Sequence, residues 1–288
     1  MRDSVKPGLL NAMTVDVEDY FHVSALAETI RRDDWASMEY RAESSTDRLL
    51  AMFDEYGIKS TFFVLGWVTK KSPGLIRRIH AAGHEVACHG LTHELVYNQT
   101  PEVFRRETEE SKALLEQTIG APVVGYRAAS YSITQESLWA LDILCELGFA
   151  YDSSIFPISH DRYGIPGAST KPGKLKTPNG SYIVEFPLST KPVLGVRVPV
   201  SGGGYFRLMP YWFTRWALRS LNGDQQSFAF YLHPWEIDPE QPRVRASLLS
   251  RFRHYNNLDV CERRLRSLLG DFRFTTMRNL LRPHLEAA

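Results

Sequence analysis

The sequence predicts an α/β fold in which a parallel sheet of seven or eight strands, each followed by a helix, closes into a distorted barrel. Three observations support this prediction. Amphipathic helical stretches alternate with short β-branched and aromatic runs over most of the 288 residues. Ser, Thr and Pro precede the predicted helices, and Gly follows them. A parallel sheet of this length closes most economically as a barrel, whose reactive groups gather at the carboxyl ends of its strands.

The alternation is clearest in the first half of the chain. Thr100 and Pro101 predict the start of a long helix and Gly120 its end, and similar signals bound the other elements. We expect strands at 12–17, 60–65, 84–88, 123–127 and 149–153, separated by helices at about 46–57, 72–83, 100–120 and 134–148.

The pattern loosens over 155–209, where Pro, Gly and Ser are frequent and only 182–186 is strongly strand-like. A helix at 210–221, a strand at 228–232, one or two helices within 244–269 and a strand at 272–276 then follow. We therefore expect one catalytic domain over 1–288, made of a barrel at about 12–240, a loop-rich insertion at 155–209 and a helical extension at 241–288.

Composition excludes several classes of protein. The chain has 34 basic and 33 acidic side chains, a net charge of +1, so no strong field favours nucleic acid or an anionic membrane. Three scattered cysteines, Cys88, Cys145 and Cys261, predict neither a disulfide framework nor a thiolate metal cluster. No signal peptide or membrane-spanning run is visible, which predicts a soluble cytoplasmic enzyme.

Two segments directly after predicted strands carry candidate metal ligands. Asp16, Glu18 and Asp19 follow the first strand, and such close carboxylates repel one another unless something positive lies among them. His89 and His93 are four residues apart, and neutral imidazole is a common zinc ligand. Either segment alone could be structural, the first as a solvated turn. Together they supply the two imidazoles and one carboxylate of a catalytic metal site with open positions.

Two further segments also follow predicted strands. Arg127 could pair with a carboxylate and keep it ionised, or close a surface salt bridge. His233, held between Leu232 and Pro234, could be a general acid or a core histidine.

The order of these segments resembles the five-motif series of the polysaccharide deacetylases with NodB homology, also known as carbohydrate esterase family 4. The resemblance spans about 14–235 and includes 16–19, 89–93, Arg127 with Tyr131, 152–154 and 232–234. The opening at 16–22 and the run at 202–207 resemble the branch found with exosortase-linked exopolysaccharide loci.

The resemblance implies that Asp16 is the general base, Arg127 its charge partner and His233 the general acid. It also implies that His89 and His93 bind a divalent metal, Zn²⁺ or alternatively Co²⁺ or Ni²⁺. The third ligand is less defined, because the commoner pattern of two adjacent aspartates is absent here. Glu18 would point the same way as Asp16 in an extended strand, so we favour it, while Asp19 and a frame with Glu18 as the base remain open.

Protonated His233 needs a nearby carboxylate, for which Asp152 is the candidate. A backbone N–H near Tyr131 would help to stabilise an oxyanion. Tyr205, Arg207 and Trp235 are candidate substrate-binding residues, the first two in a flexible, glycine-rich loop that could equally be a simple turn.

The implied reaction is hydrolysis of N-acetyl groups on an amino-sugar oligosaccharide or polysaccharide, such as an exopolysaccharide containing N-acetylglucosamine. One alternative is a metal-independent cyclic-amide hydrolase of the allantoinase-like branch, although such relatives lose the imidazole pair. Another is a catalytically silent carbohydrate-binding protein. The oligomeric state is not predicted.

Overall fold

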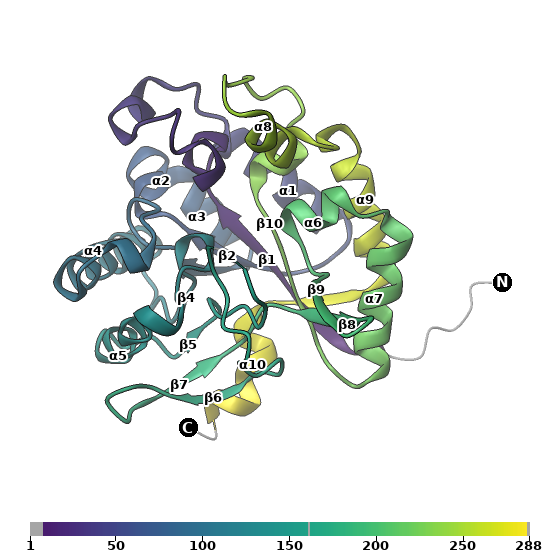
Figure 1. Ribbon diagram of the computed structural model, residues 1–288. Helices are drawn as coiled ribbons and strands as arrows, with labels where there is room; N and C mark the ends of the chain where they lie inside the picture. Colours follow the sequence, from purple (N-terminus) through teal and green to yellow (C-terminus); the bar gives the residue numbers. More distant parts are fainter. Residues whose placement is uncertain (1–7, 161, 287–288) are drawn as a thin grey trace.

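The computed structural model describes residues 8–160 and 162–286, which form an α/β fold around one strongly curled sheet (Figure 1). The strands are β1 (Leu10–Val17), β2 (Thr61–Val64), β3 (Glu85–Cys88), β4 (Gly125–Tyr126), β5 (Tyr151–Asp152), β6 (Gly173–Lys176), β7 (Tyr182–Glu185), β8 (Thr190–Val193), β9 (Val196–Pro199), β10 (Ala229–Leu232) and β11 (Arg273–Thr275). The helices are α1 (Ala42–Glu55), α2 (Gly66–Lys71), α3 (Pro73–Ala81), α4 (Pro101–Ile119), α5 (Trp139–Glu146), α6 (Gly203–Leu208), α7 (Tyr211–Gly223), α8 (Leu248–Tyr255), α9 (Leu258–Asp271) and α10 (Met277–Glu286).

The sheet has the strand order β10-β1-β2-β3-β4-β5-β7-β6, with β11 also pairing with β1. Neighbouring strands are parallel except for β6 and β7, which form an antiparallel hairpin at one edge. Strands β8 and β9 form a separate antiparallel ribbon.

The predicted closed barrel is wrong for the described residues, because the curled sheet stays open between β10 and β6. The segment between β5 and β10 forms two antiparallel hairpins, β6–β7 and β8–β9, and only β7 pairs with the parallel strands. The open side is bridged by irregular chain instead. Ser201 pairs with β10 through its carbonyl, which accepts the Tyr231 N–H at 2.9 Å, and the Ser189 hydroxyl accepts the Ala229 N–H at 3.1 Å.

Alternating residues of β1 explain how the sheet positions a site. Met13, Val15 and Val17 are buried in the main apolar cluster, which the outer helices share. Ala12 belongs to a second cluster inside the curl, and Asp16 lies on the same side of the strand because successive side chains alternate. The interior is therefore apolar at the amino ends of the strands and polar at their carboxyl ends.

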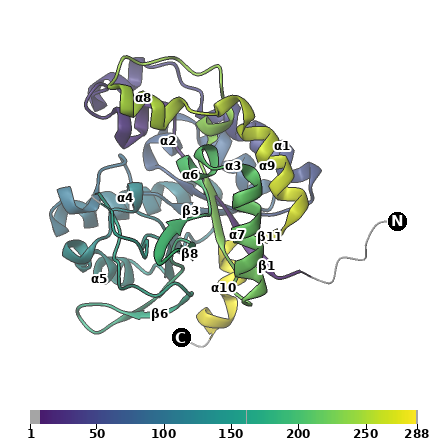
Figure 2. The same ribbon diagram turned by 45° about the vertical axis from the view of Figure 1, so that its right-hand side comes forward.

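The two ends of the curled sheet are covered differently. Helix α10, which the sequence did not predict, packs on β1 and β7 and contributes Met277 and Leu281 to the inner cluster. Helix α8 lies at the opposite end in both views (Figures 1 and 2) and contacts the short 3₁₀ turn Ser24–Leu26. None of the described helices is long and apolar enough to cross a membrane.

Candidate metal and active site

The carboxyl ends of β1, β3, β4 and β10 meet around one recess of about 210 Å³, which we call the central recess. Asp16 and Glu18 lie side by side on its floor, both 2% exposed. The Asp16 carboxylate accepts a hydrogen bond from Arg127 Nη1 at 2.7 Å and one from the Tyr131 hydroxyl at 3.4 Å.

Arg127 is held rigidly in the interior of the curled sheet. Besides Asp16, its guanidinium donates to Thr14 Oγ1 at 2.8 Å and to the carbonyl and hydroxyl oxygens of Ser153 at 3.1 and 3.0 Å. It also lies 4.1 Å from the centre of the Phe63 ring. A buried ion pair is stable only when its remaining hydrogen-bonding groups are satisfied, and these contacts satisfy them. Arg127 therefore places a positive charge directly against the buried Asp16 carboxylate.

Glu18, His89 and His93 form a three-residue cluster whose potential ligand atoms lie within 4.8 Å of one another. Glu18 Oε2 is 2.8 Å from His93 Nε2, yet it is buried without a hydrogen bond of acceptable geometry. An orphaned buried carboxylate oxygen next to two imidazoles is the environment expected of a ligand to one cation.

His89 has the protonation state that a metal ligand needs. Its Nδ1 donates to the Arg127 carbonyl at 2.8 Å, which leaves the Nε2 lone pair for a metal. Burial lowers the pKa of His89 to about 4, so the imidazole is neutral near pH 7. The residues present thus fit a divalent ion, with three protein ligands and room for water or substrate.

The structure does not bring Asp19 into this cluster. Its Oδ1 accepts the Tyr20 N–H at 2.8 Å, and its Oδ2 accepts the N–H groups of Arg41 and Ala42 at 2.6 and 2.7 Å. Asp19 therefore caps the start of α1, where the first N–H groups of a helix lack internal partners. Asp19, the alternative ligand that the sequence left open, is thus engaged in helix capping, and Glu18 is the carboxylate that lies with the two imidazoles.

His233 follows β10 and lies on the opposite side of the carboxylates from the His89 and His93 pair. Its Nε2 is 3.4 Å from Glu18 Oε1 and 4.0 Å from Asp16 Oδ2. Its Nδ1 hydrogen bonds to Glu236 at 3.0 Å. Burial alone would lower the pKa of His233, but the charges of Glu18 and Glu236 outweigh it and raise the pKa to about 9.

The carboxylate partner of His233 is Glu236, and the prediction of Asp152 in that role was wrong. Asp152 accepts hydrogen bonds from the hydroxyl and N–H of Ser154 at 2.6 and 3.1 Å. It also interacts with the buried Glu185 of β7, and neither residue lines the central recess. Asp152 therefore organises the turn after β5 and does not contact the general-acid candidate.

Arg207, a predicted substrate-binding residue, lines the central recess, but its guanidinium is engaged by protein groups. It is 2% exposed and forms an ion pair with Glu236, with Nε 2.7 Å from the carboxylate. Its remaining donors bind the carbonyl oxygens of Arg253, His254 and Asn256 at 2.8–3.0 Å. Arg207 thus fixes Glu236, which in turn fixes His233.

The glycine-rich run before Arg207 is not a flexible loop. Gly202 has φ 145° and Gly203 has φ 53°, and α6 begins at Gly203. A Cβ on Gly202 would lie 2.0 Å from the Tyr231 carbonyl oxygen, so only glycine permits this close approach.

Trp235 was predicted to bind substrate, and Tyr131 to lie near an oxyanion. In the structure both side chains mainly hold other residues of the site in position. Trp235 stacks on the imidazoles of His233 and His254, with ring centres 5.1 and 4.3 Å apart, and its indole N–H donates to Glu18 at 3.4 Å. The Tyr131 N–H, proposed near an oxyanion, donates to the Ala128 carbonyl at 3.1 Å. The Tyr131 hydroxyl instead faces Asp16, and burial keeps its pKa well above the ordinary value, so it is a neutral donor.

Backbone strain also concentrates at this site. His93, Ser130 and Tyr131 have positive φ angles of 56°, 49° and 57°. Non-glycine residues adopt this conformation at a cost, and such residues cluster at active sites.

Sequence reasoning did not assign Glu236, Thr14 or Ser153 to the site. Glu236 lies three residues after His233, in the spacing of a capping box, and its side chain does accept the His233 backbone N–H at 3.0 Å. This three-residue spacing is the sequence signal that could have identified Glu236 as the partner of His233. Thr14 and Ser153 reach Arg127 from other strands, which only the tertiary structure reveals.

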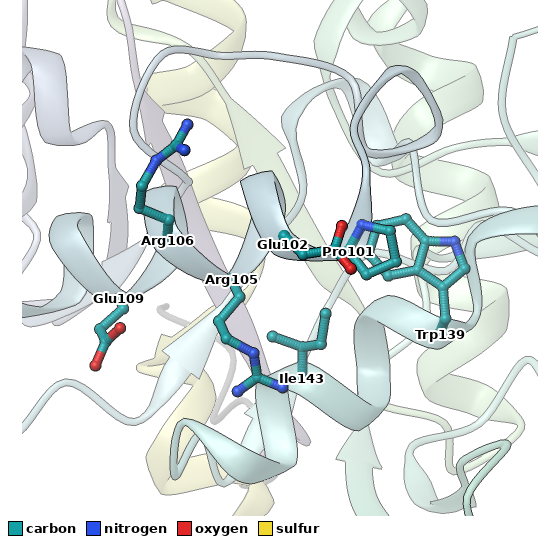
Figure 3. A pocket seen from close by; sticks show the side chains of 7 residues that line it. All are labelled: Pro101, Glu102, Arg105, Arg106, Glu109, Trp139 and Ile143. Carbon is teal, nitrogen blue, oxygen red and sulfur yellow. The ribbon is translucent and has the colours of Figure 1, made fainter.

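Another hollow, of about 390 Å³, lies between α4 and α5 on the outer surface (Figure 3). The labelled side chains include Arg105, which pairs with Glu146, and Trp139, which lies beside Pro101 (Figure 3). None of the predicted site residues lines this hollow.

The comparisons with known proteins agree with this geometry. Residues 33–151 match the polysaccharide deacetylase family, and residues 153–282 match DUF3473, a domain of unknown function. Residues 33–151 are therefore similar to the polysaccharide deacetylases. The matched region contains His89, His93 and Arg127.

Individual curated proteins are similar to this chain over part of its length. A chitooligosaccharide deacetylase from Sinorhizobium fredii is 34% identical over 141 residues, which cover 45% of this chain and 63% of the relative. A peptidoglycan-N-acetylglucosamine deacetylase from Listeria monocytogenes is 35% identical over 78 residues, 27% of this chain and 17% of the relative. The chain thus spans less than two thirds of the length of these curated relatives.

The fold is shared over nearly the whole chain. A solved structure from Mycobacterium smegmatis that is assigned to the polysaccharide deacetylases aligns with 98% of this chain and 92% of its own, with a TM-score of 0.64 and 21% identity. At this identity the similarity establishes the fold alone. The exopolysaccharide-linked branch is not decided by these matches.

Proposed function

We propose that this protein is a metal-dependent hydrolase that removes N-acetyl groups from amino sugars of a polysaccharide, such as an exopolysaccharide containing N-acetylglucosamine. The observation that carries the proposal is the placement of Glu18, His89 and His93 between an Asp16–Arg127 pair and a His233–Glu236 pair. A ligand cluster flanked by one candidate base and one candidate acid is what metal-assisted amide hydrolysis requires.

Glu18, His89 and His93 would hold the divalent ion, for which Zn²⁺ is the best match to the ligand set and Co²⁺ or Ni²⁺ are alternatives. When bound, such an ion polarises the amide carbonyl and lowers the pKa of a coordinated water.

The protein's own groups then carry the protons. Asp16, paired with Arg127, accepts a proton from the attacking water as the new C–O bond forms. His233, kept protonated by Glu18 and Glu236, donates its proton to the amide nitrogen as the C–N bond breaks. Acetate and the free amino sugar are the products. Tyr131 and Trp235 hold Asp16 and His233 in position.

The experiment that tests the proposal is acetate release from N-acetylglucosamine oligomers, after removal of metal and re-addition of zinc, cobalt or nickel. We expect release only with a divalent ion, and its loss in Asp16→Asn but not in the matched exposed variant Asp33→Asn. Folded protein that releases no acetate with any ion would contradict the proposal and favour a silent carbohydrate-binding protein. Release after complete metal removal would favour metal-independent hydrolysis.

A further inference from the structure

A second recess, of about 400 Å³, adjoins the central recess and shares Tyr163, Gly204, Tyr231 and Arg253 with it. We call it the side recess. It lies between α6, α8 and the segment after β5, and it has no role in the reaction proposed above. A linear polymer whose acetylated sugar occupies the central recess would place a neighbouring sugar in the side recess, because the two share a wall.

The two recesses differ in charge. Asp16 and Glu18 lie in the central recess, whereas none of the described residues that line the side recess is acidic. Arg162 and Arg253 both line the side recess. The two arginines would attract an anionic group to the side recess.

The guanidinium of Arg253 is available for a ligand. Arg253 is exposed, its backbone carbonyl is fixed by Arg207, and its side chain forms no ion pair or hydrogen bond with the described residues. The neighbouring Arg207, by contrast, donates to Glu236 and to three backbone carbonyl oxygens. A guanidinium whose backbone is anchored presents a planar pair of donors suited to a carboxylate.

Aromatic side chains complete the wall of the side recess. Phe252 is 54% exposed, and Tyr205 lies beside it in the same lining. Tyr163 is stacked between other rings, with 3.9 Å to the His160 ring centre and 5.6 Å to that of Phe156. Exposed aromatic faces beside fixed polar donors are typical of sites that bind small, partly apolar rings such as a sugar.

We infer that the side recess binds an anionic sugar, one that carries a carboxylate such as a hexuronate, next to the acetylated amino sugar. This inference rests on the proposed function, since it assigns the polymer that the central recess would act on. It predicts an acidic polysaccharide as substrate, in which the sugar in the side recess is recognised by Arg253 and Arg162.

The test measures binding without turnover, in protein from which metal has been removed with a chelator. The probes are two hexasaccharides that alternate N-acetylglucosamine with glucuronate in different linkages, and the neutral N-acetylglucosamine hexamer. At low salt we expect at least one uronate probe to bind about tenfold more tightly than the neutral hexamer. This preference should weaken as salt is raised, because exposed ion pairs are screened.

Two variants test whether Arg253 is responsible for the preference for uronate probes. Arg253→Gln should remove most of it, while Arg251→Gln should keep it, because Arg251 is an exposed residue of the same helix that lines neither recess. Equal affinity for all three probes, no binding of any of them, or equal effects of the two variants would overturn the inference. Uronate preference without acetate release under any metal would instead count against the proposed reaction and leave the anionic subsite standing.

Discussion

Glu236 accepts hydrogen bonds from both the backbone N–H and the imidazole Nδ1 of His233, each at 3.0 Å. The same carboxylate pairs with the buried Arg207 at 2.7 Å. The orientation and charge of the partly buried His233, the general-acid candidate, therefore depend on two buried groups, Glu236 and Arg207.

Glu236→Gln should lower kcat and move the high-pH limit of activity to lower pH. Burial lowers the pKa of His233, and the carboxylates that outweigh burial raise it to about 9, so removing one of them lets the imidazole lose its proton at a lower pH. The measurement is kcat against pH for Glu236→Gln and for the exposed control Glu240→Gln. A Glu236→Gln profile whose high-pH limit coincides with that of the parent would contradict the assignment. Because Arg207 loses its partner, we also expect a loss of about 3 kcal/mol in stability, which thermal melting would report.

Glu18→Gln and Asp19→Asn should separate metal binding from helix capping. The first variant removes a ligand oxygen, so zinc affinity should fall by at least about a hundredfold, measured by competition with a chromophoric chelator. The second should keep zinc affinity within a few fold but lose about 1–2 kcal/mol of stability, because Asp19 caps the N–H groups of Arg41 and Ala42. The reverse pattern would place the metal on Asp19.

Gly202→Ala should destabilise the fold by about 3 kcal/mol or more. Its φ is 145°, and an added Cβ would meet the Tyr231 carbonyl oxygen at 2.0 Å. Gly223→Ala is the matched control, because no atom lies within 4 Å of its added Cβ and its φ is not positive. Urea unfolding of both variants measures the difference, and equal midpoints would show that the close approach is absent in solution.

Stability should fall as the pH is lowered from about 6.5 towards 4. Burial lowers the pKa of His84 from 6.5 to about 4, and its Nδ1 accepts the Ser60 N–H at 3.1 Å. Between these pH values the unfolded chain binds the proton more readily, so stability is complete above about 6.5 and decreases below it. The slope from one such group is at most about 1.4 kcal/mol per pH unit.

Urea unfolding at pH 7.5 and pH 5 would measure this dependence. His84→Asn should be less stable at pH 7.5 but show a smaller loss between the two pH values, while the exposed control His80→Asn should behave as the parent. An unchanged slope in His84→Asn would assign the acid sensitivity to other buried histidines, such as His254.

Local signals in the sequence predicted much of the helical layer correctly. Thr100 does cap α4 through Val103 N–H, and Gly120 ends it in the left-handed conformation with φ 68°. These signals depend on the chemistry of adjacent residues, so they can be read without the fold. The prediction of a closed barrel was wrong because closure depends on how residues 155–209 pair with the rest of the sheet. That segment has no periodic pattern from which its pairing could be predicted.

The candidate site could likewise be predicted where it depends on local sequence, but not where it depends on tertiary packing. Asp16 lies at the carboxyl end of a strand, and His89, Arg127 and His233 each follow one, so the parallel order of the strands brings them together. The strand order does not predict which buried acidic side chain pairs with which basic one. Asp152 and Glu236 both lie near candidate motifs in the sequence, and only the packing of α6 against the turn after β10 decides that Arg207 and His233 pair with Glu236.

The pairing of β1 with strands from both ends of the chain has a consequence for biosynthesis. Strand β1 carries Asp16, yet its neighbours β10 and β11 are encoded more than 200 residues later, with Ala12 contacting both Ala229 and Thr275. During translation, one edge of β1 stays unpaired until the last strand leaves the ribosome. We therefore expect nascent chains truncated before β10 to need protection from aggregation.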